Sequence, residues 1–274
     1  MKKGLILLFL LFALIPNLCL AQELESKGDS VASESGNYLI ASTGFQNKAS
    51  FMSRDFGQKI PIFSTELLFW HRSGVYLSTT LSKFLTTDLS WQKGVGAGFF
   101  KPLSPKLDVD FSYHHFFGAS NLNSTGQDNL GMAQGTIGLD WGILYSTTQA
   151  MYLVNSPGDF FISSRHSRYF ELDKPIKGGG VLSFEPRFSV FLGTSNYYRI
   201  GGYEFTTSQY LETQHFTAQG LEMALPITLS YSKVEFQLEP RWVIPTQVPE
   251  YDTSLPRFQL AIKASYTLSL KRSK

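Results

Sequence analysis

Two pairs of histidine and serine are the first candidates for chemistry in this sequence. His71 and Ser73 lie two residues apart, so on a strand they would share one face and could pair for nucleophilic attack. Gly74 follows at once, however, and no acidic or amide residue stands at a spacing that would orient the imidazole. His166 and Ser167 are adjacent and would point to opposite faces of a strand. We therefore expect a turn at His71 and no catalytic residue.

Metal and cofactor sites are also weakly supported. Asp108, Asp110 and His114 share one face of a predicted strand, but successive side chains on such a face are roughly 7 Å apart, which is wide for shared ligation. The glycine-rich stretches 94–98 and 177–180 are not followed by a helix whose N-terminus could hold a phosphate. We expect neither a metal nor a cofactor.

The most informative charged residues are those that alternate with apolar residues along predicted strands. On one shared face they are Glu66, Asp108, Asp110, Asp140, Glu185, Glu222, Glu235 and Glu239, against Arg187, Arg241 and Lys263. Eight acidic and three basic groups leave an excess of five negative charges. Such a set could line an aqueous interior that favours cations, or it could form a water-poor, salt-bridged plug with a structural role only.

The elements that carry these charges have a period of two. In residues 258–270 one face is formed by Phe258, Leu260, Ile262, Ala264, Tyr266, Leu268 and Leu270, and the other is polar or small. The runs are about 11 to 14 residues long, and a tilted strand needs roughly 9 to 11 residues to cross a bilayer. Amphipathic helical windows are hard to find after residue 21. The pattern predicts an all-β protein with a single transmembrane antiparallel β-barrel.

Twelve strands are expected, with 10 or 14 as alternatives, and the segment 147–180 is the least certain part of the count. They are residues 37–46, 61–71, 75–84, 91–101, 107–117, 131–145, 147–154, 160–170, 181–192, 221–231, 234–244 and 258–270. The short links near residues 72, 102, 146, 174 and 232 fall on one side and the long links on the other. Because short turns of bacterial barrels face the periplasm, both termini are predicted to be periplasmic.

One predicted strand carries glycine at every second position. Gly94, Gly96 and Gly98 share a face, which indicates a curved wall or the close approach of another group. We expect these glycines to leave space on one wall of the barrel. Residues of the next-to-last strand, Glu235, Glu239 and Arg241, would narrow another wall.

The start of the chain has the features of a targeting segment. Residues 1–21 combine Lys2 and Lys3, an apolar core and a cleavage site after Ala21, and residues 22–36 form a polar leader. Cleavage would remove the only cysteine, Cys19, and leave 22 Lys and Arg against 22 Asp and Glu. A lipoprotein is a weaker alternative, because Leu18 stands where a lipobox needs a small residue. The balanced charge gives no indication of nucleic-acid binding.

The sequence as a whole resembles the Gram-negative outer-membrane β-barrels, and more narrowly the small barrels of Bacteroidota. The resemblance is carried by Leu20-Ala21-Gln22, by residues 225–231 (LPITLSY), by residues 239–242 (EPRW) and by the last strand. It implies a barrel over residues 37–270 in the cell outer membrane. Such barrels commonly end on an aromatic residue, whereas here residues 271–274 (KRSK) form a tail after Leu270.

These features lead to three alternatives for function. The first is a narrow passive pore for small solutes or ions. The second is a non-conducting structural or adaptor barrel in a larger envelope complex, and the third is a barrel hydrolase of the lipase or deacylase type. The expected partners are outer-membrane lipid, the barrel-assembly machinery and other envelope proteins, with no nucleic acid.

Location gives the first testable prediction. The protein should fractionate with the outer membrane, and its migration on a denaturing gel should change on boiling, because a folded barrel resists detergent at low temperature. Cell fractionation followed by paired boiled and unboiled samples measures both. Recovery as a soluble periplasmic protein would contradict the barrel and leave a β-sandwich as the alternative.

Overall fold

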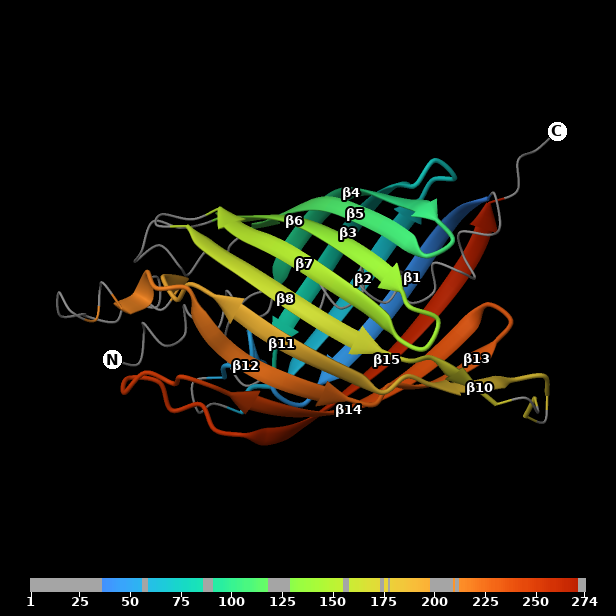
Figure 1. Cartoon of the computed structure of the whole chain (residues 1–274). Helices are drawn as coiled ribbons and strands as arrows, with labels where there is room; N and C mark the ends of the chain where they lie inside the picture. Colours follow the sequence, from blue (N-terminus) through green and yellow to red (C-terminus); the bar gives the residue numbers. More distant parts are fainter. Residues whose placement is uncertain are drawn as a thin grey trace.

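A closed ring of antiparallel strands forms the wall of the protein (Figure 1). The computed structural model describes residues 36–55, 59–85, 91–117, 129–154, 158–172, 175–176, 178–197, 209 and 212–270. The expected segments 1–21, 22–35 and 271–274 lie outside these residues. Within them, no helix is long and apolar enough to cross a membrane.

Fifteen strand segments make up the wall. They are β1 (Asn37–Gln46), β2 (Ile62–Trp70), β3 (Val75–Phe84), β4 (Gln92–Ser104), β5 (Leu107–Phe117), β6 (Asn129–Asp140), β7 (Tyr145–Val154), β8 (Asp159–Ser167), β9 (Phe170–Glu171), β10 (Val181–Phe184), β11 (Arg187–Gly193), β12 (Thr217–Ala224), β13 (Ile227–Tyr231), β14 (Val234–Pro245) and β15 (Arg257–Leu270). The pairs β8 and β9, β10 and β11, and β12 and β13 each continue one strand past a two-residue break. The ring therefore has twelve strands, and the predicted fold class is confirmed.

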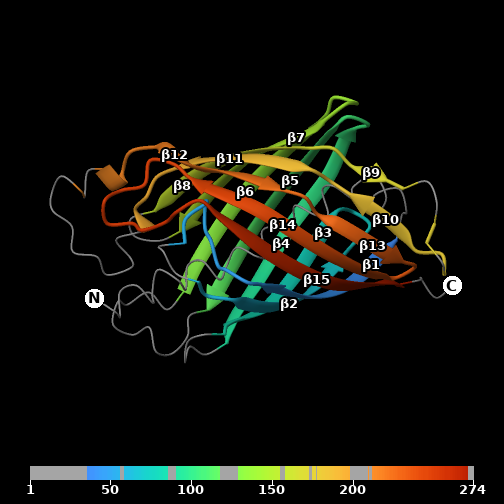
Figure 2. The same cartoon turned by 90° about the horizontal axis from the view of Figure 1, so that it is seen from below.

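The ring closes at the two ends of the chain. β1 pairs with β15 from Asn37 opposite Leu270 to Gln46 opposite Ala261, and β12 pairs with β14. Closure leaves no unpaired edge, which is what a sheet needs in a lipid environment. Asn37 and Leu270 lie at the same rim, which we call the short-turn end because the brief links between strands are there; the other rim is the long-loop end (Figures 1 and 2).

Prolines explain two of the three breaks. Pro186 separates β10 from β11, and Pro226 separates β12 from β13. A proline has no N–H to donate, so each interrupts the hydrogen-bond ladder with its neighbour. Pro240 in β14 adds a third at the same level of the wall, since it lies opposite Leu225. The backbone hydrogen bonding of these three neighbouring strands is therefore interrupted at the same level of the wall.

The outer face is an apolar belt. Every second residue points outward and is exposed, as for Leu77, Phe111, Ile137, Phe236 and Ile262. This agrees with the predicted alternation, because a barrel in a bilayer must turn its apolar side chains toward lipid. The inner positions of the same strands carry serine, threonine, glutamine and charged residues.

The glycine row on β4 corrects the expectation of free space. An added Cβ at Gly94 would meet Phe116, one at Gly96 would meet His114, and one at Gly98 would overlap the ring of Tyr76. The rings belong to residues on β3 and β5, which flank β4. The glycines therefore let aromatic side chains of neighbouring strands lie flat across the wall. These rings occupy the space that a side chain at each glycine would otherwise fill.

The link between β6 and β7 is also placed differently from the prediction. We expected one strand over residues 131–145 and a turn at Ser146, but β6 ends at Asp140 and the turn covers residues 141–144. The Asp140 carboxylate accepts the N–H of Gly142 at 2.7 Å, and Gly142 has a φ of 83°. An aspartate followed by a left-handed glycine favours a turn, and this local bond ends the strand.

The glycine row gives the second prediction. Gly98→Ala should lower the free energy of unfolding by about 1–3 kcal/mol, because its Cβ would displace the Tyr76 ring. Gly44→Ala is the matched control on β1, since its Cβ would lie no closer than 3.4 Å to another atom. Urea unfolding of the refolded barrel in detergent measures both. Equal stability of the two variants would contradict the packing described for β4.

Candidate functional site

A ladder of ion pairs crosses the inner wall where the prolines interrupt the strands. The charged ladder consists of Glu185, Arg187, Glu222, Glu239 and Arg241, from the strands β10–β11, β12 and β14. Arg187 Nη2 lies 2.6 Å from Glu185, and its Nη1 lies 3.6 Å from Glu239. Arg241 pairs with Glu239 and lies 3.7 Å from Glu222. Each arginine thus has two carboxylates.

The sequence places this ladder through two copies of one tripeptide. Glu185-Pro186-Arg187 and Glu239-Pro240-Arg241 both turn the proline outward and the two charges inward, as the period of a strand requires. The intervening strand supplies Ala224, which lies opposite both arginines and leaves room between them. Ion pairs this well buried are stable only with close partners, so the ladder holds three adjacent strands together through side chains.

The predicted acidic residues of β5 are held by tyrosines. Asp110 accepts the hydroxyl of Tyr76 at 3.0 Å on either oxygen, and Asp108 accepts that of Tyr145 at 3.0–3.1 Å. Tyr76 also stacks on Trp70 in an aromatic cluster near the short-turn end. These carboxylates are therefore fixed to the wall by hydrogen bonds to neighbouring strands.

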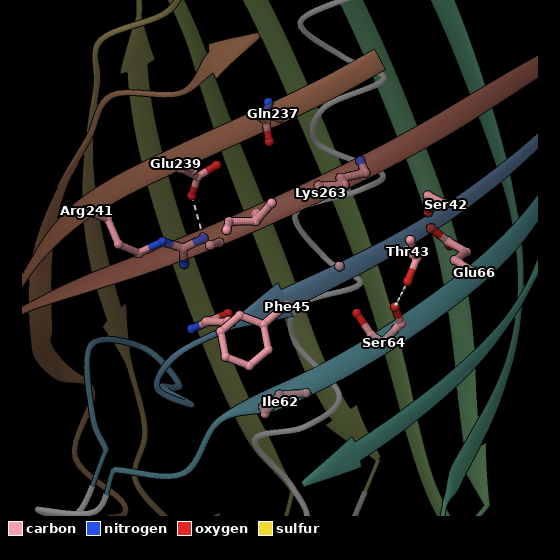
Figure 3. Close-up of a pocket in the computed structure, with 14 residues that line it drawn as sticks. Ser42, Thr43, Phe45, Ile62, Ser64, Glu66, Gln237, Glu239, Arg241 and Lys263 are labelled. Atoms are coloured by element: carbon pink, nitrogen blue, oxygen red, sulfur yellow. Dashed lines mark hydrogen bonds and ion pairs between the residues drawn. The ribbon is translucent and has the colours of Figure 1, made fainter. Parts of the chain in front are cut away.

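A cavity of about 60 Å³ lies against the inner wall between β1, β2, β14 and β15 (Figure 3). The inner-face residues that line it are Ser42, Gly44, Gln46, Ile62, Ser64, Glu66, Gln237, Glu239, Arg241, Ala261 and Lys263. Its volume is enough for on the order of four water molecules. The cavity joins the charged ladder to Glu66 and Lys263, so its walls carry both signs of charge and several hydrogen-bonding groups.

The other predicted charges have varied positions. Glu235 accepts a hydrogen bond from Ser230 at 3.3 Å near the short-turn end. Asp140 is the last residue of β6 and keeps the phase of its inner face, and its carboxylate accepts the N–H of Gly142 at the rim. Arg165 on β8 was missed, although it lies on the inner face opposite Thr147 and Ser189.

Of the two histidine–serine pairs, His71 and Ser73 are bonded to each other, whereas His166 and Ser167 are not. His71 Nδ1 lies 2.8 Å from Ser73 Oγ and 3.3 Å from the Ser73 N–H, within an exposed turn. Bonding of both groups to one nitrogen is typical of a side chain that closes a turn. His166 and Ser167 point to opposite faces, and His166 bonds instead to Ser146 at 2.9 Å.

Metal ligation has no candidate in the part of the chain that the structure describes. There, no group of three or more histidine, cysteine, aspartate or glutamate side chains converges on one point. Asp110 and His114 both lie on the inner face of β5 but four residues apart along the strand.

Comparison with known proteins gives a likeness in fold. No protein-family model matches the sequence, and no curated protein matches it in sequence. An outer-membrane channel from Pseudomonas putida F1 superposes with a TM-score of 0.50 at 9% identity, covering 85% of this chain and 96% of the channel. The NanC porin superposes with a TM-score of 0.48 at 11% identity over 84% of this chain and all of the porin. The KdgM porin has a TM-score of 0.47 at 7% identity over 84% and 98%. The first likeness supports the barrel fold.

The geometry of the turn gives the third prediction. His71→Ala and Ser73→Ala should leave the protein without change in any activity, because the pair closes a turn and, among the described residues, no acidic or amide side chain bonds to the imidazole. Hydrolysis of phospholipid and short-chain ester substrates by wild type and both variants measures this. A wild-type activity that disappears in either variant would establish a hydrolase.

Proposed function

We propose that this chain is an outer-membrane barrel that acts as a narrow passive pore for small solutes or ions, with a preference for cations. The observation that carries the proposal is the cavity beside the charged ladder, with Glu66, Glu239 and Lys263 on its walls. An aqueous path needs such groups inside the wall, whereas a side chain that faces lipid at mid-depth is costly when charged. Both ends of the barrel lie at the short-turn end, so in this proposal both termini face the periplasm.

The size of the ring agrees with a narrow passage. Eight strands enclose a space that side chains fill, and 16 to 18 strands enclose an open channel, so twelve strands leave the width to the inner residues. Here the inside of the barrel is narrowed on one side by the aromatic side chains that cover the β4 glycines. On the other side it is narrowed by the charged ladder. The cavity lies between β1 and β2 and the ladder strand β14.

Cation preference follows from the charge that remains uncompensated. The inner face of β8 adds one acidic and one basic residue, Asp159 and Arg165, to the predicted set, so its acidic excess stays at five. Arg187 and Arg241 each contact two carboxylates, so neither offers a positive charge to a passing anion. Acidic excess in a confined passage raises the local concentration of cations.

Ion selectivity gives the fourth prediction. Replacing Glu235 and Glu239 with Gln should reduce cation preference without unfolding the barrel, since Arg187 keeps Glu185 and Arg241 keeps Glu222. Reversal potentials of the purified protein in planar bilayers under a salt gradient measure the preference. Gln237→Ala on the same strand, which changes no charge, is the control.

Two outcomes would overturn the pore. Anion preference would contradict the charge argument, and absence of conductance at any voltage in folded protein would favour the adaptor. The adaptor alternative uses the same ladder as a structural brace and predicts that the barrel is recovered with other envelope proteins after mild detergent extraction.

A further inference from the structure

A short hairpin folds from the end of β1 into the long-loop end of the barrel. We call residues 47–55 the mouth hairpin. Phe51 and Arg54 exchange two backbone hydrogen bonds of 2.7 Å, so Met52 and Ser53 form its tip. Its base is held to β15, where Leu260 N–H donates to Asn47 and Lys48 donates to the Phe258 carbonyl, each at 2.9 Å.

Phe51, next to the tip, lies on the far side of the mouth from the strand that carries the hairpin. Phe51 packs edge-on against Phe161 of β8 at 5.0 Å and against Tyr197 at 5.3 Å. Around the ring, β8 is reached from β1 only after β15, β14, β12 and β11, which is five positions in a ring of twelve strands. Since six positions would be diametrically opposite, the hairpin crosses the mouth.

Two ion pairs fasten the hairpin, one to the segment between β14 and β15 and one to the first residue of β15. Arg54, with 1% of its surface exposed, lies 3.6 Å from Asp252 and donates to the carbonyls of Thr246 and Gln247. Asp55 pairs with Arg257, and its N–H donates to Ser254 Oγ at 2.9 Å. We call these two pairs the latch. Removing one partner of a buried pair leaves a charge without compensation, so each pair holds the hairpin only while both members are present.

The tip is strained in its docked position. Met52 and Ser53 have φ values of 46° and 67°, both in the left-handed region. A two-residue turn with both central residues in this region is of type I′, and such positions are usually occupied by glycine or asparagine. Ser53 also fits closely over Gly220 of β12, where an added Cβ would clash with it. Such strain is maintained only by surrounding contacts, and here these are Phe51, the latch and the Gly220 seat.

We propose that the mouth hairpin is a gate, and that the latch sets how often the pore is open. With the latch closed, the hairpin lies across the mouth above the cavity, and Ser50 and Gln46 both bond to Gln259 at 3.1 and 3.3 Å. With the latch broken, the charges regain water and the strained tip relaxes, which favours the open state. The inference rests on the proposed pore.

The test is the conductance of the full-length protein in planar bilayers with the latch removed. Arg54→Ala should raise the open fraction about tenfold or more, because the buried Asp252 would lose the guanidinium charge that faces it. Lys59→Ala is the matched control, since Lys59 is exposed on the same loop. Asp55→Arg should open the pore likewise, and the double variant Asp55→Arg with Arg257→Asp should restore the wild-type open fraction.

An engineered disulfide can hold the gate shut, and its reduction releases the gate in the same protein. The sequence has Cys19 as its only cysteine, so Asp55→Cys with Ser254→Cys introduces a defined pair where the two residues already touch. The oxidised form should conduct less than wild type, and reduction should raise conductance above wild type because the Asp55–Arg257 pair is absent.

The outcomes separate the gate from the pore. If wild type and all latch variants conduct equally, or if the oxidised pair conducts as well as the reduced pair, the gate is overturned and the pore stands. If none of them conducts, although boiled and unboiled samples show a folded barrel, the pore and its gate are both overturned. A rise in Lys59→Ala equal to that in Arg54→Ala would overturn the role of the latch.

Discussion

Pairing of every strand with two neighbours is the constraint on which the rest of the structure depends. In lipid, an unpaired backbone N–H or C=O costs several kcal/mol, so the wall must close on itself. Closure is achieved by the ten residue pairs that join β1 to β15. It fixes which face of each strand points inward, and thereby brings Lys263 of β15 to the same cavity as Glu239 and Arg241 of β14.

The row of prolines is the place where this constraint is relaxed. Pro186, Pro226 and Pro240 each accept one hydrogen bond from the neighbouring strand but return none, at distances of 3.0–3.3 Å. The charged ladder lies inside the same region and joins the same three strands. Side-chain ion pairs thus join the strands where backbone hydrogen bonds are missing.

Much of the fold could be predicted from the sequence because alternation is a property of each strand by itself. The pattern in residues 107–117 and 258–270 is clear, and both strands form as expected. Features that depend on neighbours could not be predicted. The rings over Gly94, Gly96 and Gly98 come from adjacent strands, and the partners of Arg54 and Asp55 lie some two hundred residues away. The end of β6 was misplaced, because the hydrogen bond from Gly142 to Asp140 closes a turn where the strand was expected to continue to residue 145.

The position of the latch along the chain has a consequence for biogenesis. Arg54 and Asp55 follow the first strand. Asp252 and Ser254 precede the last strand, and Arg257 is its first residue. Both ion pairs therefore bridge the seam where the first and last strands meet, and neither can form while that seam is open. A chain that stalls during insertion keeps an unfastened mouth, and only a fully assembled barrel acquires the closed one. Formation of the latch therefore depends on completed assembly of the barrel.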